Sequence, residues 1–416
     1  MNIKILLTSG FLVASLASSA QSDKAYAITG SGVNDFKWMN IREVDLGTGQ
    51  VVNTVFERSI TPYQMTDVAT KKTVDQTATA NVFGSRDYPT ATFVAAAAFD
   101  KRTNKLFFTP MRMGELRWLD LNEGQKTPRF YTLCSDMLRS ASSSSDEGAN
   151  ITRMVIGADG NGYAISNDGN HLFRFTTGRH PVITDLGALM DDESNKGISV
   201  HNKCTSWGGD MLADAFGNLY IISANHMVFK VNLETRNTLH IGNINGLPAG
   251  YSTNAAAVNK EGEIVIASAN VFDGYYKFSL DNFNAIKLEG SDKQFNASDL
   301  AGSNLLLQKE ADAVNKFDMS DSKLNTLSSN AGTRIYPNPI TTNKFNILFD
   351  EKADGNYSVV LSDLAGRVIL TRKVSITKGG QLQSINVPAN LARGMYMVNV
   401  LDASRHNVIT EKVLIQ

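Results

Sequence analysis

The chain has little of several features that would assign it to a common protein class. It carries only 2 cysteines, 9 prolines and 6 histidines in 416 residues. Two cysteines, Cys134 and Cys204, are too few for a disulfide scaffold and are not spaced as a metal site. The 40 basic and 41 acidic side chains nearly cancel, so charge gives no indication of a nucleic-acid partner or an anionic membrane surface.

Long apolar runs are absent beyond the N-terminus, so we expect no transmembrane segment. The N-terminus has the layout of a cleavable signal peptide: Lys4, an apolar stretch from Ile5 to Leu16, then small residues before Gln21. The stretch is shorter than the roughly 20 residues that a membrane-spanning helix needs. We therefore predict that residues 1–20 are removed and that the protein works outside the cytoplasm.

Recognisable catalytic motifs are also missing. The sequence has no nucleophile elbow, no zinc-protease helix motif, no phosphate-binding loop and no dinucleotide-binding glycine pattern. The turns at 159–162 and 167–170 share residue types with calcium loops but lack their spacing. We therefore assign no catalytic residue, no metal ligand and no cofactor.

A short repeated phrase is the strongest positive signal. An apolar residue, two further residues, another apolar residue and a small polar residue recur along the chain, each typical of one short strand. The six copies are 41–46, 116–121, 172–177, 228–233, 275–280 and 314–319. A second apolar run precedes five of these phrases, usually after a glycine-containing turn that is typical of hairpins. The five runs are 106–108, 163–165, 219–221, 264–266 and 305–307.

A third run, rich in small apolar residues, lies in front of each turn, as at 93–99 and 254–258. Antiparallel units of three or four strands, repeated every 40 to 60 residues or so, predict a β-propeller. We predict six blades, with seven as the alternative, because residues 58–91 are either a long loop or a degenerate blade. The first repeat lacks an inner strand of its own, and 324–328 is a candidate for closing the ring.

The starts of the inner strands form the predicted ligand site at the mouth of the channel. The predicted ligand-binding residues are Thr92, Arg153, Trp207, Asp210, Asn254 and Asn296. Polar groups that converge beside an aromatic ring fit the capture of a glycan, a peptide or a protein segment, although such residues also satisfy backbone groups at strand ends. The two cysteines lie in long loops expected on this face, so a Cys134–Cys204 disulfide is an open alternative to two free thiols.

Composition changes near the end of the predicted propeller, which we place at 21–328. Residues 329–334 are small and polar, as in a linker, and about seven short strands follow, typical of a small sandwich. Four motifs occur there in order. They are Tyr336-Pro337-Asn338-Pro339, Asp363-Leu364-Ala365-Gly366-Arg367, Gly394-Met395-Tyr396 and the terminal run that begins at Lys412.

With these motifs behind a signal peptide, residues 335–416 resemble the type A C-terminal sorting domain of the type IX secretion system. The resemblance implies an immunoglobulin-like sandwich, recognised by an outer-membrane translocon in Bacteroidetes. It also implies removal by a sortase-like peptidase, with the cargo attached to the cell surface or released.

We therefore predict an exported all-β protein whose propeller is a non-catalytic binding module for an extracellular ligand. The alternative is a secreted hydrolase or lyase with carboxylates at the propeller mouth, Asp210 first among them, because propellers host both binding and catalysis.

Overall fold

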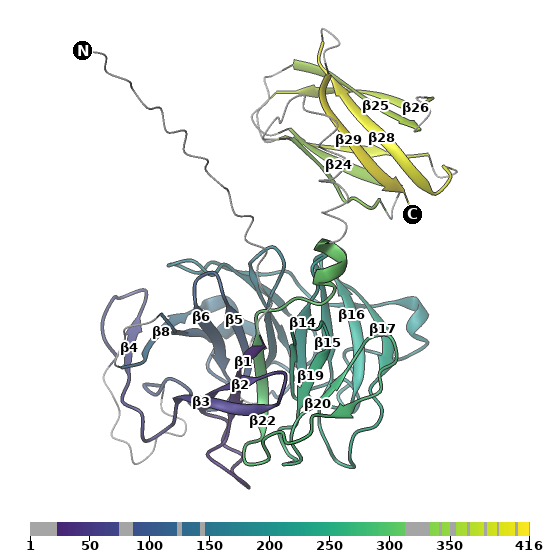
Figure 1. Cartoon of the computed structure of the whole chain (residues 1–416). Helices are drawn as coiled ribbons and strands as arrows, with labels where there is room; N and C mark the ends of the chain where they lie inside the picture. The colour runs from purple at the N-terminus through teal and green to yellow at the C-terminus, as the bar shows by residue number, and fades with distance from the viewer. Residues whose placement is uncertain are drawn as a thin grey trace, which may run out of the picture. The chain divides into compact units, whose positions relative to one another are not determined.

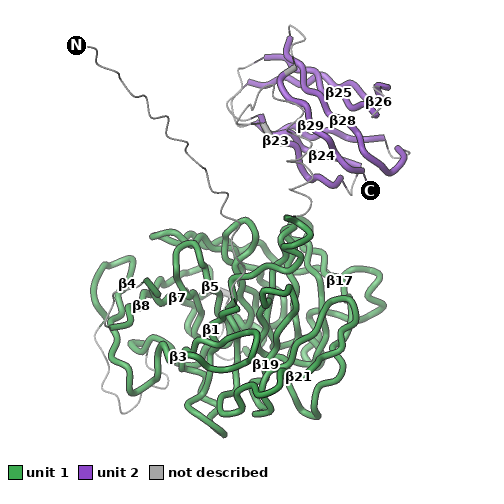
Figure 2. Tube along the Cα trace, viewed as in Figure 1, with its two compact units in different colours: residues 1–317 green, residues 318–416 purple. Residues whose placement is uncertain are grey.

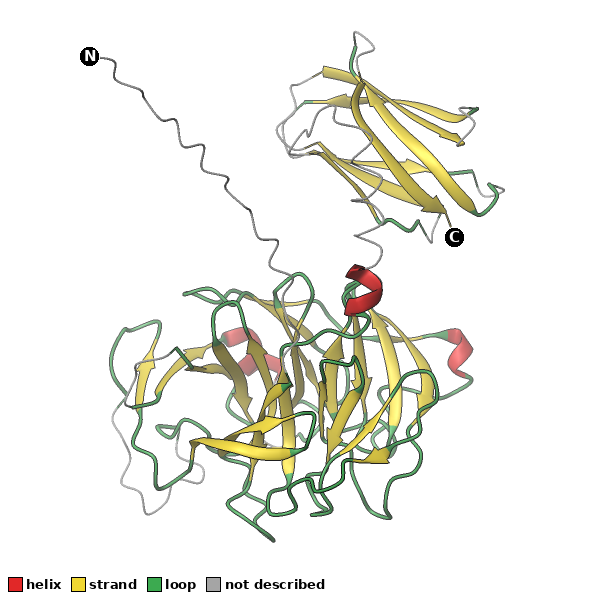
Figure 3. Cartoon of the chain, viewed as in Figure 1, coloured by secondary structure: helices red, strands yellow, loops and turns green. Residues whose placement is uncertain are grey.

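The computed structural model (Figure 1) consists of two units, residues 1–317 and residues 318–416 (Figure 2). It describes residues 23–74, 86–122, 127–141, 146–312, 333–340, 343–349, 355–363, 367–377, 381–388, 391–403 and 407–415. Both units are built from strands, with only short helices (Figure 3), which confirms the predicted all-β class. None of the helices in these ranges has the length and apolar character needed to cross a membrane. The predicted signal peptide and the sixth repeat phrase lie outside the described residues.

Five sheets make up the first unit. From the inner strand to the outer one, the first sheet consists of β22 (Ala297–Gly302), β1 (Lys24–Thr29), β2 (Asn40–Asp45) and β3 (Gln50–Phe56), and the second of β5 (Val94–Asp100), β6 (Lys105–Pro110), β7 (Glu115–Asp120) and β8 (Arg129–Cys134). In the same order, the third sheet consists of β9 (Ile151–Ile156), β10 (Gly162–Ser166), β11 (Leu172–Phe175) and β12 (Ile183–Asp185), and the fourth of β14 (Asp210–Ala213), β15 (Asn218–Ile222), β16 (Met227–Asn232) and β17 (Asn237–Asn243). The fifth sheet consists of β18 (Ala255–Val258), β19 (Ile264–Ala267), β20 (Tyr276–Phe278) and β21 (Ile286–Lys287). The strands within each of these sets are antiparallel.

Two short strands extend the outer edges of two sheets. β4 (Gln64–Asp67) pairs in parallel with β8, and β13 (Met190–Asp191) pairs in parallel with β17. The helices α1 (Asp136–Ala141) and η2 (Glu193–Asn195) lie in the connections between sheets. The segment 58–91, predicted as a long loop or a degenerate blade, contributes β4 to the second sheet and forms no sheet of its own in its described part.

The inner strands pack against one another in a closed ring. β22 contacts β5, β5 contacts β9, β9 contacts β14, β14 contacts β18, and β18 returns to β22. The propeller is confirmed, but the described residues form five blades where six or seven were predicted. In the described part of the sixth repeat, Leu305–Leu307, expected as a strand, instead crosses the end of the ring. There Leu306 donates its N–H to the Ala213 carbonyl at 3.0 Å.

The ring closes through β22, which the chain reaches last in the propeller. β22 pairs antiparallel with β1, with Ala27 opposite Leu300 and Ala25 opposite Gly302. This supplies the inner strand that the first repeat lacks. Residues 324–328, the predicted closing strand, lie outside the described part of the chain, and the ring is closed without them.

Small residues form the inner strands because five of them converge on one axis. Ala96, Ala97 and Ala98 of β5 are at most 2% exposed, and Ala255, Ala256 and Ala257 of β18 at most 1%. Larger side chains fill the spaces between neighbouring blades, as Phe107, Trp118 and Phe175 do between the second and third sheets. Full burial of such a side chain contributes about 1.5–3 kcal/mol.

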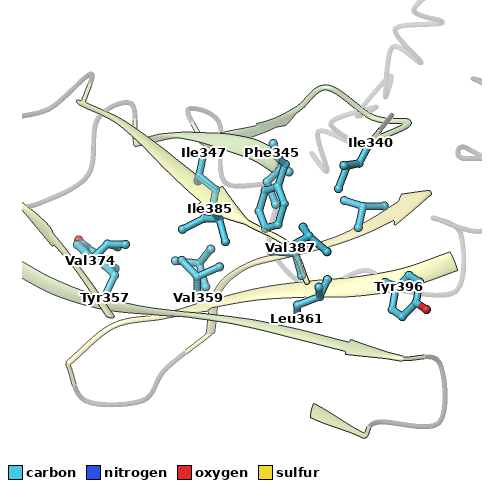
Figure 4. Close-up of a cluster of buried hydrophobic side chains, with 14 of the residues drawn as sticks. Ile340, Phe345, Ile347, Tyr357, Val359, Leu361, Val374, Ile385, Val387 and Tyr396 are labelled. Atoms are coloured by element: carbon cyan, nitrogen blue, oxygen red, sulfur yellow. The ribbon is translucent and has the colours of Figure 1, made fainter. Parts of the chain in front are cut away.

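The second unit is a two-sheet sandwich. One sheet has the order β23 (Thr333–Tyr336), β24 (Lys344–Phe349), β27 (Gln381–Asn386), and the other β26 (Val368–Ile376), β25 (Gly355–Asp363), β28 (Gly394–Leu401), β29 (Asn407–Ile415). Side chains from both sheets meet in the core, as Figure 4 shows for Phe345 and Ile385 opposite Val359 and Leu361. The predicted linker 329–334 ends earlier than expected, since β23 begins at Thr333; residues 329–332 lie outside the described ranges.

Candidate functional site

The two ends of the propeller channel differ in chemistry. We call the end where the inner strands begin, at Val94, Ile151, Asp210, Ala255 and Ala297, the start mouth. The end where they finish, at Asp100, Ile156, Ala213, Val258 and Gly302, is the end mouth. The middle of the channel is closed, because side chains from all five inner strands leave a cavity of only about 10 Å³ there. That is room for at most one water molecule, so a larger ligand cannot occupy the middle of the channel.

At the start mouth, Asp210 is 1% exposed and joins three inner strands. Its Oδ2 accepts the N–H of Ala256 in β18 at 2.6 Å and that of Leu300 in β22 at 3.3 Å. Its Oδ1 accepts the N–H of Met211 at 2.7 Å. The carboxyl therefore satisfies backbone donors on the channel axis instead of facing solvent.

Asp299 of β22 lies beside Asp210 and is also fully buried. The two carboxyl groups interact electrostatically, although neither Asp299 oxygen has an aligned hydrogen-bond partner among the described residues. Burial raises the pKa of Asp210 to about 7. Burial and the neighbouring Asp210 raise the pKa of Asp299 well above its ordinary value, since both disfavour the charged form. The sequence analysis did not single out Asp299, because its role depends on a neighbour 89 positions away.

Arg153 of β9 is the buried cation near this pair, and it is 0% exposed. Its Nε donates to the Gly208 carbonyl at 2.9 Å and its Nη2 to the Ser206 carbonyl at 2.5 Å. Burial lowers the pKa of Arg153 to about 10, partly opposed by the charge of Asp210. Arg153 thus holds the loop that precedes β14 and has no donor directed toward solvent.

Thr92 and Asn296 also use their polar atoms within the protein. Thr92 Oγ1 donates to the Met111 carbonyl at 2.6 Å. The buried Asn296 donates through Nδ2 to the Ala269 carbonyl and accepts the Gly30 N–H through Oδ1. For these two residues, as for Arg153 and Asp210, the observed contacts match the strand-end role that the sequence analysis weighed against ligand binding.

Trp207 and Asn254 are only partly buried. Trp207 donates its Nε1–H to the His201 carbonyl at 3.1 Å, and the Lys203 ammonium lies 5.1 Å from the centroid of its ring. Oδ1 of Asn254 is buried without a hydrogen-bond partner. Of the six predicted residues, these two retain a surface or an atom that a ligand at the start mouth could use.

A cavity of about 440 Å³ lies at the end mouth, and a second, of about 500 Å³, lies beside Asp45 and Lys260 between the first and fifth sheets. The end-mouth cavity is lined by the turn after β5, the turn after β9 and the segment that follows β22. Its polar side chains are Asp100, Lys101, Arg102, Ser303, Asn304 and Gln308, and its apolar ones include Phe99, Val155, Ile156, Ala158 and Leu305. Oγ of Ser303 is buried without a hydrogen-bond partner. The sequence analysis missed this cavity because it assigned Leu305–Leu307 to a blade.

Arg102 ties together the two turns beside the cavity. Its Nε donates to Oδ1 of the buried Asp100 at 3.0 Å, and its Nη2 donates to the Gly160 carbonyl of the next blade and to Thr177 Oγ1 at 3.3 Å. Bonds from Arg102, Thr177 and Thr103 lower the pKa of Asp100 although its burial acts in the opposite direction. These hydrogen bonds of Arg102 hold the wall of the cavity in place, while the turn residue Ala158 remains exposed.

Residues 303–312, which we call the strap, form the third wall. Asn304 Nδ2 donates to the Val258 carbonyl at 2.9 Å, and Lys309 Nζ donates to the Glu261 carbonyl at 2.8 Å. Leu306 bridges in parallel to Asp214 after β14. The strap is therefore attached to two blades while it lines a cavity beside two others.

Cys134 and Cys204 are both free and exposed in the structure, so the disulfide alternative is not formed in it. The Cys134 thiol donates to Oε1 of Glu115 at 3.6 Å. Burial is the largest cause of its raised pKa, followed by the negative charge of Glu115. A raised pKa keeps this thiol in its less reactive protonated form.

The sorting motifs have clear structural positions in the second unit. Asn338 Oδ1 accepts the Leu414 N–H at 2.9 Å, and its Nδ2 donates to the Lys412 carbonyl at 2.8 Å, which ties the first motif to β29. Asp363 pairs with Arg367 at 2.7 Å across the turn between β25 and β26. The buried Tyr396 follows Gly394 in β28 and donates its hydroxyl to the Ala392 carbonyl at 2.7 Å. Gly366 lies outside the described residues.

Fold and motifs together define an exported β-propeller with a C-terminal sorting sandwich. Residues 334–416 match the family of secretion system C-terminal sorting domains, which confirms the resemblance seen in the motifs. This domain assigns the protein to type IX secretion, and so to the cell surface or the extracellular space. No curated protein matches the chain.

Solved structures give weak similarities. One is PorZ, an essential bacterial surface component of the type IX secretion system of Porphyromonas gingivalis, at 13% identity and a TM-score of 0.32, covering 94% of this chain and 51% of PorZ. Another is a catalytically inactive virginiamycin B lyase from Staphylococcus aureus, solved with quinupristin, at 10% identity and a TM-score of 0.28, covering 77% of this chain and 83% of the lyase. A third, of unknown function, is from Bacteroides caccae, at 11% identity and a TM-score of 0.30, covering 88% and 99%. The chain spans about half the length of PorZ, and similarities this weak transfer no function.

Proposed function

We propose that this protein is a non-catalytic binding module, displayed on the cell surface or released, whose propeller takes a short glycan or peptide segment in the end-mouth cavity. The observation that carries the proposal is the cavity itself. Its volume of about 440 Å³ falls within the range of roughly 300–1,000 Å³ that is usual for ligand sites. It combines apolar walls with a few fixed polar groups, which is the usual composition of such sites.

The state of the acidic residues supports binding over the hydrolase alternative. Asp210, the first carboxylate of that alternative, is 1% exposed and accepts three backbone N–H groups. At the end mouth, Asp100 is held by Arg102 and Thr103. A general acid or base must reach its substrate within hydrogen-bond distance; Asp210 is not placed to do so, and Asp100, although it lines the cavity, is already engaged by Arg102 and Thr103.

The sorting domain supports the delivery of this module. Its family resemblance favours recognition by the type IX translocon and removal by a sortase-like peptidase, which leaves the propeller as the working part outside the cell.

A cavity-filling substitution tests the site. The purified secreted protein is applied to glycan and peptide arrays as wild type, as Ala158→Trp and as Glu234→Trp. Ala158 is an exposed turn residue that lines the cavity, and Glu234 is an exposed turn residue outside it, so the pair separates filling of the cavity from the general effect of a surface tryptophan.

We expect binding to one class of probe that Ala158→Trp lowers at least tenfold, about 1.4 kcal/mol of binding free energy, and that Glu234→Trp leaves unchanged. Binding that survives Ala158→Trp would place the ligand elsewhere. Absence of binding to every probe, or turnover of any arrayed polymer by the wild type, would reject the proposed function.

A further inference from the structure

Three ionisable side chains lie together on the propeller axis without access to solvent. Arg153, Asp210 and Asp299 come from the inner strands β9, β14 and β22 and are each at most 1% exposed. Two of these strands, β14 and β22, are not neighbours in the ring, since β18 lies between them. The group therefore connects blades that the sheets themselves do not join.

The charges in this group balance only if one proton is retained. Arg153 supplies one positive charge, and no carboxylate lies within 4.0 Å of its guanidinium among the described residues. Two ionised carboxylates would bring two negative charges into contact in a buried channel, which is strongly unfavourable. One ionised and one protonated carboxyl give a neutral group.

Hydrogen-bond geometry indicates which carboxyl holds the proton. Asp210 accepts three backbone N–H groups, which stabilise its ionised form. The N–H of Ala97 faces Asp299, but within the described part of the chain no donor forms a well-aligned hydrogen bond with either Asp299 oxygen. An unprotonated Asp299 would thus be a buried charge without stabilising donors.

We propose that Asp299 stays protonated in the pH range where Asp210 is ionised and donates a hydrogen bond to it, so that this proton links the ring-closing strand β22 to β14. This hydrogen bond lies at the closure of the ring, because β22 follows the other four inner strands in sequence and pairs with β1, the first strand of the propeller. Among the described residues of the strands packed around the pair, those of β5 and β18 bring no titratable side chain to it, whereas β9 contributes Arg153. Asp168, in the loop after β10, interacts electrostatically with Arg153.

The direction of the pH dependence follows from the protons that each state binds. In the unfolded chain both aspartates are ionised above about pH 4. The folded chain retains protons on this pair at higher pH, because both pKa values are raised. Folding is therefore accompanied by proton uptake in this pH range. As the pH rises, the pair makes the folded state less stable. For each retained proton, the unfolding equilibrium constant increases by up to about tenfold per pH unit. Above about pH 7 only Asp299 continues this effect.

Unfolding by urea at about pH 5, 7 and 9 tests this link in the full chain. The variants are Asp299→Asn, which keeps a hydrogen-bond donor but cannot ionise, and Asp281→Asn, an exposed turn residue, as the control. We expect the propeller midpoint of the wild type and of Asp281→Asn to fall between pH 7 and pH 9, and that of Asp299→Asn to stay nearly constant. Equal pH profiles for Asp299→Asn and the wild type would overturn the proposal.

Infrared spectroscopy of the wild type gives a second test that does not depend on the variant folding. A protonated carboxyl has a carbonyl-stretch band separate from that of carboxylates, and exposed carboxyls are ionised at neutral pH. We expect one such band in the folded protein at about pH 8, where Asp210 is mostly ionised, lost on unfolding and, if the variant folds, lost in Asp299→Asn. Absence of the band from the folded wild type would reject a retained proton.

Discussion

The propeller and the sorting sandwich differ in how far apart along the chain their important residues lie. In the sandwich, Asp363 pairs with Arg367 and Tyr396 bonds to Ala392, so two of the motifs are closed within four residues. In the propeller, the bonds that close the ring join distant residues, as Ser298 Oγ does in donating to the Val94 carbonyl. Motifs that are closed by local contacts can be recognised in a sequence, whereas the closure of a ring depends on contacts between residues that are far apart in it.

The difference also separates the roles of the two units. The sandwich matches the sorting-domain family, and its motif residues hold its own turns and edges together. In the propeller, the buried polar residues Arg153 and Asp210 hold blades together. The end-mouth cavity is lined instead by residues such as Ala158 and Ser303, which have no sequence signature.

Removal of residues 335–416 tests whether the two roles separate, and has the largest expected effect. We expect loss of secretion, with the propeller retained in the periplasm in folded form, because the removed residues are those that match the sorting-domain family. Cell fractionation and protease resistance of the retained chain measure the two parts. Secretion at the wild-type level would show that the propeller also carries export information.

Arg153→Met tests whether the stability of the propeller depends on the long-range contacts of the buried polar groups on its axis. It leaves the Gly208 and Ser206 carbonyls without their donor, and each buried acceptor left unsatisfied costs about 1–3 kcal/mol. We expect the propeller transition in calorimetry to move to lower temperature and the sandwich transition to stay in place. Arg174→Met, at an exposed position of the same blade, should stay within about 0.5 kcal/mol of wild type. Equal effects of the two variants would contradict the axial role.

Asn338→Ala tests the sandwich and has the smallest expected effect. It removes two hydrogen bonds to β29, worth about 1–2 kcal/mol together at an exposed site. We expect only the sandwich transition to shift, whereas Asn356→Ala, an exposed change in β25, should leave it unchanged. A shift of the propeller transition in Asn338→Ala would break the comparison between two separate units.

Much of the fold could be predicted from the sequence because a strand leaves a local pattern. Five of the six repeat phrases overlap the third strands of the five blades, from β2 to β20, and the small-residue runs before them are inner strands. The blade count was wrong, although a signal for it was present. Five inner-strand starts had been identified and the first repeat lacked one, so the fifth inner strand had to close the first blade.

The candidate site was less predictable because each of its parts depends on a distant neighbour. The strand starts were located correctly, but whether a polar residue there binds a ligand or a backbone group depends on what lies across the axis. Asp210 accepts its N–H groups from Ala256 and Leu300, and neither partner can be inferred from the residues around position 210.

The sequence by itself determined the strands, their turns and the sorting domain, because hydrophobic alternation, glycine turns and short motifs act over a few residues. Only the tertiary structure decided that five blades close through β22, that two aspartates meet on the axis and that the strap leaves a cavity at the end mouth. The physical reason is that ring closure and burial depend on contacts between residues that are up to hundreds of positions apart. The chemistry of a carboxyl or a guanidinium is set by those contacts and not by its neighbours in the chain.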